Sequence, residues 1–368
     1  MILTCSKSRQ RLASFTRLGA WLGAFLALPM AAQAQGVPAP IPTSQEPLKV
    51  QSQLHVVEAS VADSHGDFRN DLKASQFLIL DNGVEQKITF FEPVESPAHI
   101  AVLIETSPAV YLIQGQHLSA AYALLDGLAT TDEVALVTYD EKTRLVLPFT
   151  ADKRALLEAL DGLQYFLGMG DLNFYDAVRS TLAWLPAANG KKALLVLATG
   201  LDSSPPAHWQ ALQHELQMTD VPVFTVALGG SVRDHKGKKP EGKNKPQDEK
   251  NAGTGSQDET ANAERKTEVE AAEASFERAD AALREIAETT GGRSYFPASL
   301  NEFAKVYREI AAQLRHQYLL AYTPPAPDGR IHTIEIRVVD AQRRVLGAIG
   351  VAHGMRVYAR QSYLAPEK

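Results

Sequence analysis

Three runs of apolar residues constrain the fold more than any other feature of this sequence. Residues 100–104 read IAVLI, residues 193–197 read ALLVL, and residues 221–228 read VPVFTVAL. Strands that are buried on both faces have such nearly continuous apolar runs, in which Thr225 is here the single polar residue, and they occur in parallel sheets covered by helices on each side. Segments with helical periodicity alternate with these runs. The sequence therefore predicts an α/β fold with a doubly wound, mostly parallel sheet. Further strands are predicted at residues 134–137 and 145–147, and helices at residues 120–128, 156–163, 175–185, 209–218, 281–290 and 300–314.

Both flanks of this region have a β pattern instead. Residues 77–80 and 88–91 are apolar runs on either side of Asn82-Gly83. An Asn-Gly pair between apolar runs predicts a tight hairpin, because both positions tolerate positive φ. Residues 331–339 alternate apolar and polar side chains, as a half-buried antiparallel strand does. We therefore expect residues 48–95 and 317–368 to form a β-rich subdomain beside an α/β domain at residues 98–316.

A charged segment interrupts the predicted α/β domain. Residues 233–266 hold nine Lys or Arg and seven Asp or Glu residues, with no large apolar side chain. Such a composition cannot bury enough surface to order itself. We expect a disordered insert at residues 231–268 that grades into a charged helix from Thr267 to Arg278.

The first 34 residues have the features of a secretory signal peptide. A basic start is followed by an apolar stretch at residues 18–28, which is too short to span a membrane permanently. Ala32 and Ala34 are the small residues that signal peptidase requires. We therefore expect export to the periplasm or the exterior, with cleavage after Ala34, and a Pro-rich linker at residues 35–47. The basic residues are Lys7, Arg9, Arg11 and Arg17.

Composition and motif searches exclude several function classes. The single cysteine, Cys5, rules out an intramolecular disulfide framework, and a net charge of −6 argues against a nucleic-acid partner. The sequence has no Gly-x-Ser-x-Gly elbow and no phosphate loop. His214-Glu215 lacks the second histidine of a zinc protease, since Met218 stands in its place. No further apolar stretch reaches the length of a membrane span. We expect no catalytic residue and no enzyme activity.

Four short motifs, in order along the chain, point to a known family. They are residues 81–88 (DNGVEQKI), 174–177 (FYDA), 289–292 (TTGG) and 314–318 (LRHQY). With these motifs the sequence resembles a von Willebrand factor A (VWA) domain, and it is similar to exported bacterial proteins described as VWFA-related. The resemblance extends over nearly the whole chain after residue 34. It implies a Rossmann-like fold and a role in protein–protein interaction or adhesion.

The resemblance also implies a metal site, from which this sequence departs. VWA domains of this family bind Mg²⁺ through Asp-x-Ser-x-Ser after the first core strand, with a Thr and an Asp from two later loops. The corresponding positions here are Glu105, Ser107, Ala109, Leu172 and Gly200. Because Mg²⁺ tolerates distorted geometry poorly, the lost oxygen ligands predict a degenerate metal-ion-dependent adhesion site that works without a cofactor. Its vestiges would be Glu105, Ser107 and Asp202.

We expect a protein partner to bind at the carboxyl ends of the core strands, where open α/β sheets bind their ligands. The loops concerned are residues 105–110, 168–173 and 199–204. The candidate contact residues are Glu105, Thr106, Ser107, Asp171, Asn173, Thr199 and Asp202.

Two alternatives stay open at this point. One is a metal-assisted hydrolase in which Glu105, Asp171 and Asp202 form a carboxylate cluster, which requires the three side chains to converge. The other is a structural envelope component that has no saturable partner.

Overall fold

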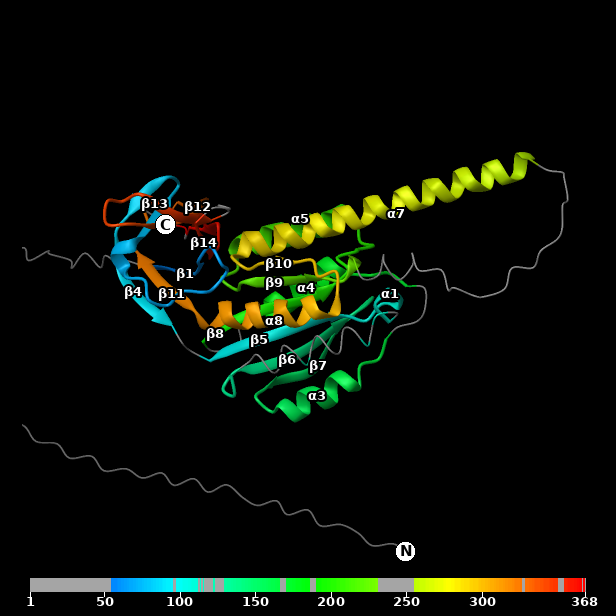
Figure 1. The fold of residues 1–368 in the computed structure, drawn as a ribbon, viewed down its shortest axis with the longest axis horizontal. Coiled ribbons are helices and arrows are strands. Elements are labelled where there is room, and N and C mark those ends of the chain that lie inside the picture. Colours follow the sequence, from blue (N-terminus) through cyan, green and yellow to red (C-terminus); the bar gives the residue numbers. More distant parts are fainter. Residues whose placement is uncertain are drawn as a thin grey trace, which may run out of the picture. The chain divides into compact units, whose positions relative to one another are not determined.

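The computed structural model describes residues 54–94, 97–111, 113, 115, 122, 129–165, 170–185, 190–230, 255–325, 328–349, 354–365 and 367. The predicted signal peptide at residues 1–34 and the linker at residues 35–47 lie outside the described residues, as do residues 231–254 of the predicted insert. The described strands form a six-stranded sheet and a nine-stranded sheet (Figure 1).

The six-stranded sheet contains the three apolar runs as neighbouring strands. Its order is β10 (Ser294–Tyr295), β9 (Val223–Ala227), β8 (Lys191–Ala198), β5 (Ala98–Glu105), β6 (Glu133–Tyr139) and β7 (Thr143–Thr150). Adjacent strands pair in parallel from β10 to β6, and β7 joins antiparallel to β6. The carboxyl ends of β5, β6 and β8 therefore lie at the same edge of the sheet.

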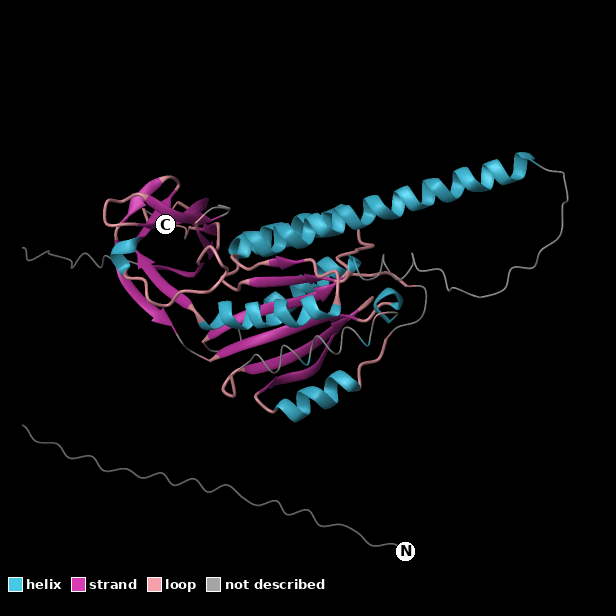
Figure 2. Ribbon diagram, in the orientation of Figure 1, coloured by secondary structure: helices cyan, strands magenta, loops and turns pink. Residues whose placement is uncertain are grey.

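Helices bury both faces of this sheet (Figure 2). Side chains of α3 (Lys153–Asp161) and α8 (Leu300–Arg315) pack with Ile100, Val102 and Ile104 of β5. On the other face, Ala101 and Leu103 pack with α4 (Phe174–Trp184), α5 (Pro206–Met218) and the end of α7 (Gly255–Thr290). Both faces of β5 are thus apolar, which explains its uninterrupted run. A short helix, α1 (Pro108–Tyr111), follows β5.

The nine-stranded sheet is assembled from segments that precede and follow the α/β region. Its order is β3 (Val84–Gln86), β2 (Phe77–Asp81), β12 (Ile331–Val339), β13 (Val345–Ile349), β14 (Met355–Ala359), β1 (His55–Ala62), β11 (Gln317–Tyr322) and β4 (Ile88–Val94), with β15 (Ser362–Leu364) paired to β12. A 3-10 helix (Ala74–Gln76) precedes β2. Strand β1 lies between β14 and β11, so strands from the two flanks alternate in the sheet.

The predicted hairpin around Asn82-Gly83 has a different second strand. The two residues have φ angles of 48° and 79°, and they join β2 to the short β3. The apolar run at residues 88–91 instead lies in β4, which pairs with β11 at the far end of the sheet. In this pairing the ring of Phe91 stacks on that of Tyr318 of β11, with 5.6 Å between centroids, and also lies 5.5 Å from the ring of Phe77 of β2.

Helix α7 starts earlier than expected. It begins at Gly255, so residues 255–268, which we predicted to be disordered, are helical in the structure. Ala, Glu, Lys and Arg are good helix formers, and charge alone does not oppose a helix. Lys266 and Glu270, one turn apart, place Nζ and Oε1 3.9 Å from each other.

Asp81 anchors the interior of the nine-stranded sheet. Its Oδ2 accepts hydrogen bonds from the hydroxyls of Tyr322 and Tyr363, each at 2.8 Å, and its Oδ1 lies 2.6 Å from Nδ1 of His332. The carboxyl group is buried, and a buried acid is tolerated when such partners surround it. Sequence reasoning treated Asp81 only as part of a turn motif.

Lys191, the first residue of β8, is buried without a hydrogen-bond partner for its Nζ within the described residues. Burial lowers the pKa of its ammonium group from 10.5 to about 8, against the opposing charge of Glu58. From pH 8 to 10.5 the unfolded chain therefore holds a proton that the folded chain has released. Stability is expected to rise with pH through that window.

Replacing Lys191 with methionine is expected to raise the free energy of unfolding by about 1–3 kcal/mol at pH 7. Methionine fills similar space and carries no charge to desolvate, so the gain should shrink as the pH rises from 8 to 10.5. Urea unfolding at several pH values measures this, with the less buried neighbour substitution Lys192→Met as the control. A Lys191→Met protein less stable than the wild type at pH 7 would contradict it.

Candidate functional site

Glu105, the last residue of β5, is the centre of a polar cluster at the strand ends. Its side chain is fully buried, and in the register of β5 and β6 it lies opposite Tyr139. Thr199 follows β8, the other neighbour of β5, and is also buried. The parallel pairing of three strands thus brings these residues together.

The carboxyl group of Glu105 is saturated by hydrogen bonds from the protein. Its Oε2 accepts from the backbone N–H of Thr199 at 2.6 Å, the Thr199 hydroxyl at 2.8 Å and the Tyr139 hydroxyl at 3.1 Å. Its Oε1 accepts from the hydroxyl of Ser107 at 2.5 Å. All of these donors are neutral, and among the described residues no cation pairs with the carboxyl group.

Burial governs the electrostatics of the cluster. It raises the pKa of Glu105 above its usual value, and the hydrogen bonds from Ser107 and Thr199 only partly oppose the increase. Burial also raises the pKa of the Tyr139 hydroxyl, and the negative charge of Glu105 adds to this effect. Tyr139 therefore keeps its proton and remains a hydrogen-bond donor.

Asp202 accepts hydrogen bonds from the backbone of α4 and of its own loop. Its Oδ2 accepts from the backbone N–H of Tyr175 at 2.9 Å, in the first turn of α4. Its Oδ1 accepts from the backbone N–H of Ser204 at 2.7 Å and from the Ser204 hydroxyl. A carboxylate at a helix N-terminus is favourably placed. Asp202 fastens the loop after β8 to α4.

The loop before α4 is tied to its neighbours in the same way. Leu172 donates its N–H to the hydroxyl of Ser203 and accepts from the N–H of Ser203, at 3.2 and 2.8 Å. The Asn173 side chain donates to the carbonyl of Glu141 at 2.9 Å. Asp171 is exposed.

The predicted contact residues divide into two groups. Glu105, Thr106, Ser107 and Thr199 are buried, so their side chains hold the strand ends together and are not available to a partner. Thr106 donates its N–H and its hydroxyl to the carbonyl of Tyr139, at 2.9 and 3.1 Å. The residues at the surface are Asp171, which is exposed, and Asn173 and Asp202, which are half-buried.

The carboxylate cluster of the hydrolase alternative is not formed. Glu105 is buried in its own hydrogen-bond network, Asp202 accepts from backbone amides, and Asp171 lies at the surface. Across the part of the chain that the structure describes, no three His, Cys, Asp or Glu side chains group as metal ligands would.

These residues do not fit Mg²⁺, which requires near-octahedral oxygen ligands at about 2.0–2.1 Å. Both oxygens of Glu105 already accept hydrogen bonds from the protein. The aspartate position of the family motif falls on Gly200, with φ 76°, where an added Cβ would lie 2.9 Å from Cδ1 of Leu283. A side chain there would be both strained and crowded, so the ligand cannot be restored without moving α7.

Tyr139 is the one member of the cluster that sequence reasoning missed. It lies two residues after the strand predicted at residues 134–137 and is the last residue of β6 in the structure, and its hydroxyl alone gives little signal. Its contact with Glu105 depends on the register of β5 with β6, and that register is not visible in the sequence.

Comparisons with known proteins agree with the resemblance noted above. Residues 114–202 match the sequence model of the von Willebrand factor type A domain. A search of curated proteins finds no match. No helix among the described residues has the length and apolar character needed to cross a membrane.

Several solved structures are similar at low identity. A von Willebrand factor type A protein from Catenulispora acidiphila is 12% identical over 80% of this chain and 72% of that one, with a TM-score of 0.42. The ArnB paralog VWA2 from Sulfolobus acidocaldarius is 12% identical over 84% and 75%, with a TM-score of 0.37. The vWF domain of the type V pili tip protein Mfa5 from Porphyromonas gingivalis is 19% identical over 30% and 40%, with a TM-score of 0.25.

Proposed function

We propose that this protein is an exported, non-enzymatic VWA-type interaction module that binds a protein partner without a bridging metal ion. The observation that carries the proposal is the saturated carboxyl group of Glu105. A metal ion would need the carboxyl oxygens of Glu105 to be free, but these oxygens already accept hydrogen bonds from Ser107, Tyr139 and Thr199. The strand ends are thereby fixed without a cofactor, and the loops above them are held in place for contact.

The surface left for a partner is formed by the loops around α4 and β8. Asp171, Asn173 and the segment at residues 202–204 are exposed or half-buried, and Tyr111 of α1 is 40% exposed. Binding there would rest on hydrogen bonds and packing. Partner surfaces enriched in polar and aromatic groups fit such a patch.

Export is part of the proposal, and it rests on the features of residues 1–34 in the sequence. Mass spectrometry of the protein recovered from the producing cells identifies its first residue. We expect Gln35 there, and an intact N-terminus on the functional protein would contradict export by cleavage.

A photo-crosslinking amino acid at position 171 tests the proposed surface. We expect a saturable crosslink to one protein of the cell envelope, unchanged by a chelator of divalent metals. The matched control carries the crosslinker at Val345, which is 51% exposed on β13 and outside the α/β region. Equal crosslinking from both positions would contradict the surface, and loss of the crosslink in chelator would contradict metal independence.

Calorimetric titration of Mg²⁺ and Mn²⁺ into chelator-stripped protein gives a second readout. We expect no saturable heat at millimolar metal. Saturable binding that disappears in a Glu105→Gln protein would instead restore a metal-dependent function, with Glu105 as a ligand.

A further inference from the structure

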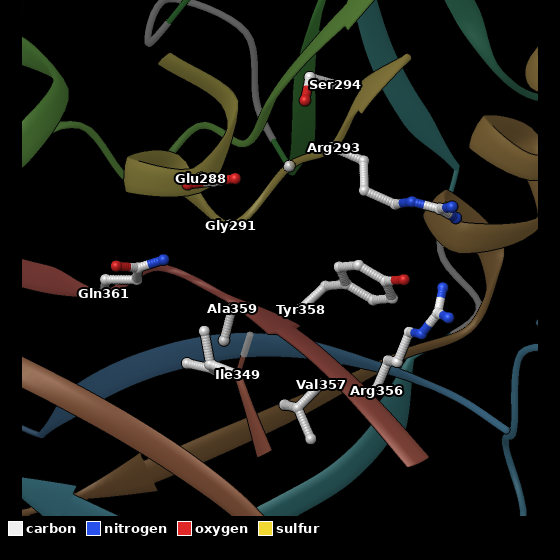
Figure 3. A pocket seen from close by; sticks show the side chains of 11 residues that line it. Glu288, Gly291, Arg293, Ser294, Ile349, Arg356, Val357, Tyr358, Ala359 and Gln361 are labelled. Atoms are coloured by element: carbon white, nitrogen blue, oxygen red, sulfur yellow. The ribbon is translucent and has the colours of Figure 1, made fainter. Parts of the chain in front are cut away.

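A pocket of about 520 Å³ lies between the C-terminal end of α7 and strands β13 and β14 (Figure 3). Its volume is in the range of small-molecule sites. It is separate from the Glu105 cluster, because Gly292 beside it packs on Val223, at the amino end of β9. The polar side chains that line it are Glu288, Arg293, Ser294, Arg356, Tyr358 and Gln361.

One side of the pocket is cationic. Figure 3 shows Arg293, Tyr358 and Arg356 extending in the same direction, with the tyrosine ring between the two arginines. The guanidinium carbon of Arg293 lies 5.2 Å from the centre of the Tyr358 ring, and its Nη1 lies 3.2 Å from Oε2 of Glu309. These contacts fix its orientation.

Arg356 is available to a ligand. It is exposed, and within the described residues its guanidinium makes no hydrogen bond or ion pair. Because Arg293 is paired with Glu309, the uncompensated positive charge on this side is that of Arg356. Its guanidinium suits a carboxylate, because arginine donates to both carboxylate oxygens in a fork.

The end of α7 does not counteract this charge. The final carbonyls of a helix are negative and would repel an anion if they were free. Here the carbonyl of Ala287 accepts from Gly292, that of Glu288 from Gly291, and that of Thr289 from Gln361, at 3.0, 3.4 and 3.4 Å.

The other side of the pocket has the opposite character. Glu288 and Gln361 lie there, apart from the arginines in Figure 3. Glu288 is exposed and forms no ion pair with the described residues. A simple anion would be repelled by this carboxylate, whereas a ligand with a cationic group at its other end would meet an opposite charge on each side.

From this arrangement we infer that the pocket binds a short peptide with free ends. Its terminal carboxylate contacts Arg356 and Arg293, and its terminal ammonium contacts Glu288. Gln361 and Ser294 offer hydrogen bonds to the peptide groups between them. This site is independent of the proposed partner surface and could operate whether or not that proposal holds.

Calorimetry with trialanine tests the inference on the protein recovered after export. We expect saturable binding in the millimolar range, and at least tenfold weaker binding in an Arg356→Gln protein. Arg343→Gln is the matched control, since Arg343 is exposed and lies in a turn of the same sheet. The amidated peptide should bind weakly to every variant.

The N-acetylated peptide isolates the role of Glu288. It should bind the wild type more weakly than trialanine does, and Glu288→Gln should abolish that difference while circular dichroism shows the protein still folded. The inference is overturned by any of three results: no saturable heat with trialanine, equal binding of the blocked peptides to the wild type, or an equal loss in Arg343→Gln.

Discussion

Replacing Glu105 with alanine is expected to lower the free energy of unfolding by about 3–5 kcal/mol. The change leaves the Thr199 N–H, the Thr199 and Ser107 hydroxyls and the Tyr139 hydroxyl without their acceptor. These groups are buried, so water cannot replace the lost carboxyl oxygens without entering the strand ends. Urea unfolding of the variant at pH 7 measures the loss.

The control for this experiment is Glu105→Gln, which keeps the shape and one acceptor oxygen. Because burial raises the pKa of Glu105 in the folded state, its contribution to stability is fully present below the usual pKa. It is lost as the pH rises through the folded value. Glutamine does not titrate, so the wild type should lose stability relative to Glu105→Gln between acid and neutral pH. This account of the site would be contradicted if the free energy of unfolding of the wild type and of Glu105→Gln depended on pH in the same way. It would also be contradicted by a Glu105→Ala protein as stable as the wild type.

A methyl group at Gly292 is expected to cost at least about 3 kcal/mol of stability. A Cβ built there lies 1.9 Å from the carbonyl oxygen of Val223 and 2.5 Å from its carbonyl carbon. Both are backbone atoms of β9, so no side-chain rotation relieves the clash. Relief of the clash therefore requires that the backbone at the end of α7 moves away from β9.

Thermal unfolding of Gly292→Ala measures this cost. Gly230→Ala is the matched control, because its Cβ would lie 3.9 Å from the carbonyl oxygen of Pro297, an ordinary contact. Equal stability of the two variants would show that α7 and β9 are less closely packed than described.

The core strands could be predicted from sequence because their environment is uniform. Strands β5, β8 and β9 are buried on both faces, so each has an apolar run, which only Thr225 interrupts in β9. The partner of residues 88–94 could not be predicted this way. A turn signal at Asn82-Gly83 indicates that the chain reverses, but it does not indicate which strand the next apolar run joins. That run lies in β4, which pairs with β11, a strand from a distant part of the chain.

The candidate site was predictable in place but not in detail. The strand-end position of Glu105 follows from the length of its apolar run, and the departure from the metal motif is visible in Ala109, Leu172 and Gly200. The sequence does not show which groups donate hydrogen bonds to the carboxyl group of Glu105. The extra methylene that makes glutamate unsuitable for the metal motif carries its oxygen to Thr199, the residue after the neighbouring strand β8.

The position of β1 between β11 and β14 limits the order in which this chain can fold during synthesis. Residues 55–62 leave the ribosome early, yet their pairing partners are residues 317–322 and 355–359. Until nearly the whole chain has emerged, Val57 and Val61 have no sheet to be buried in. Long-range pairing of this kind is slow and leaves apolar edges open to aggregation. A chain that stops before β14 therefore lacks both β14 and β15, and it also leaves β1 without a neighbour on that side.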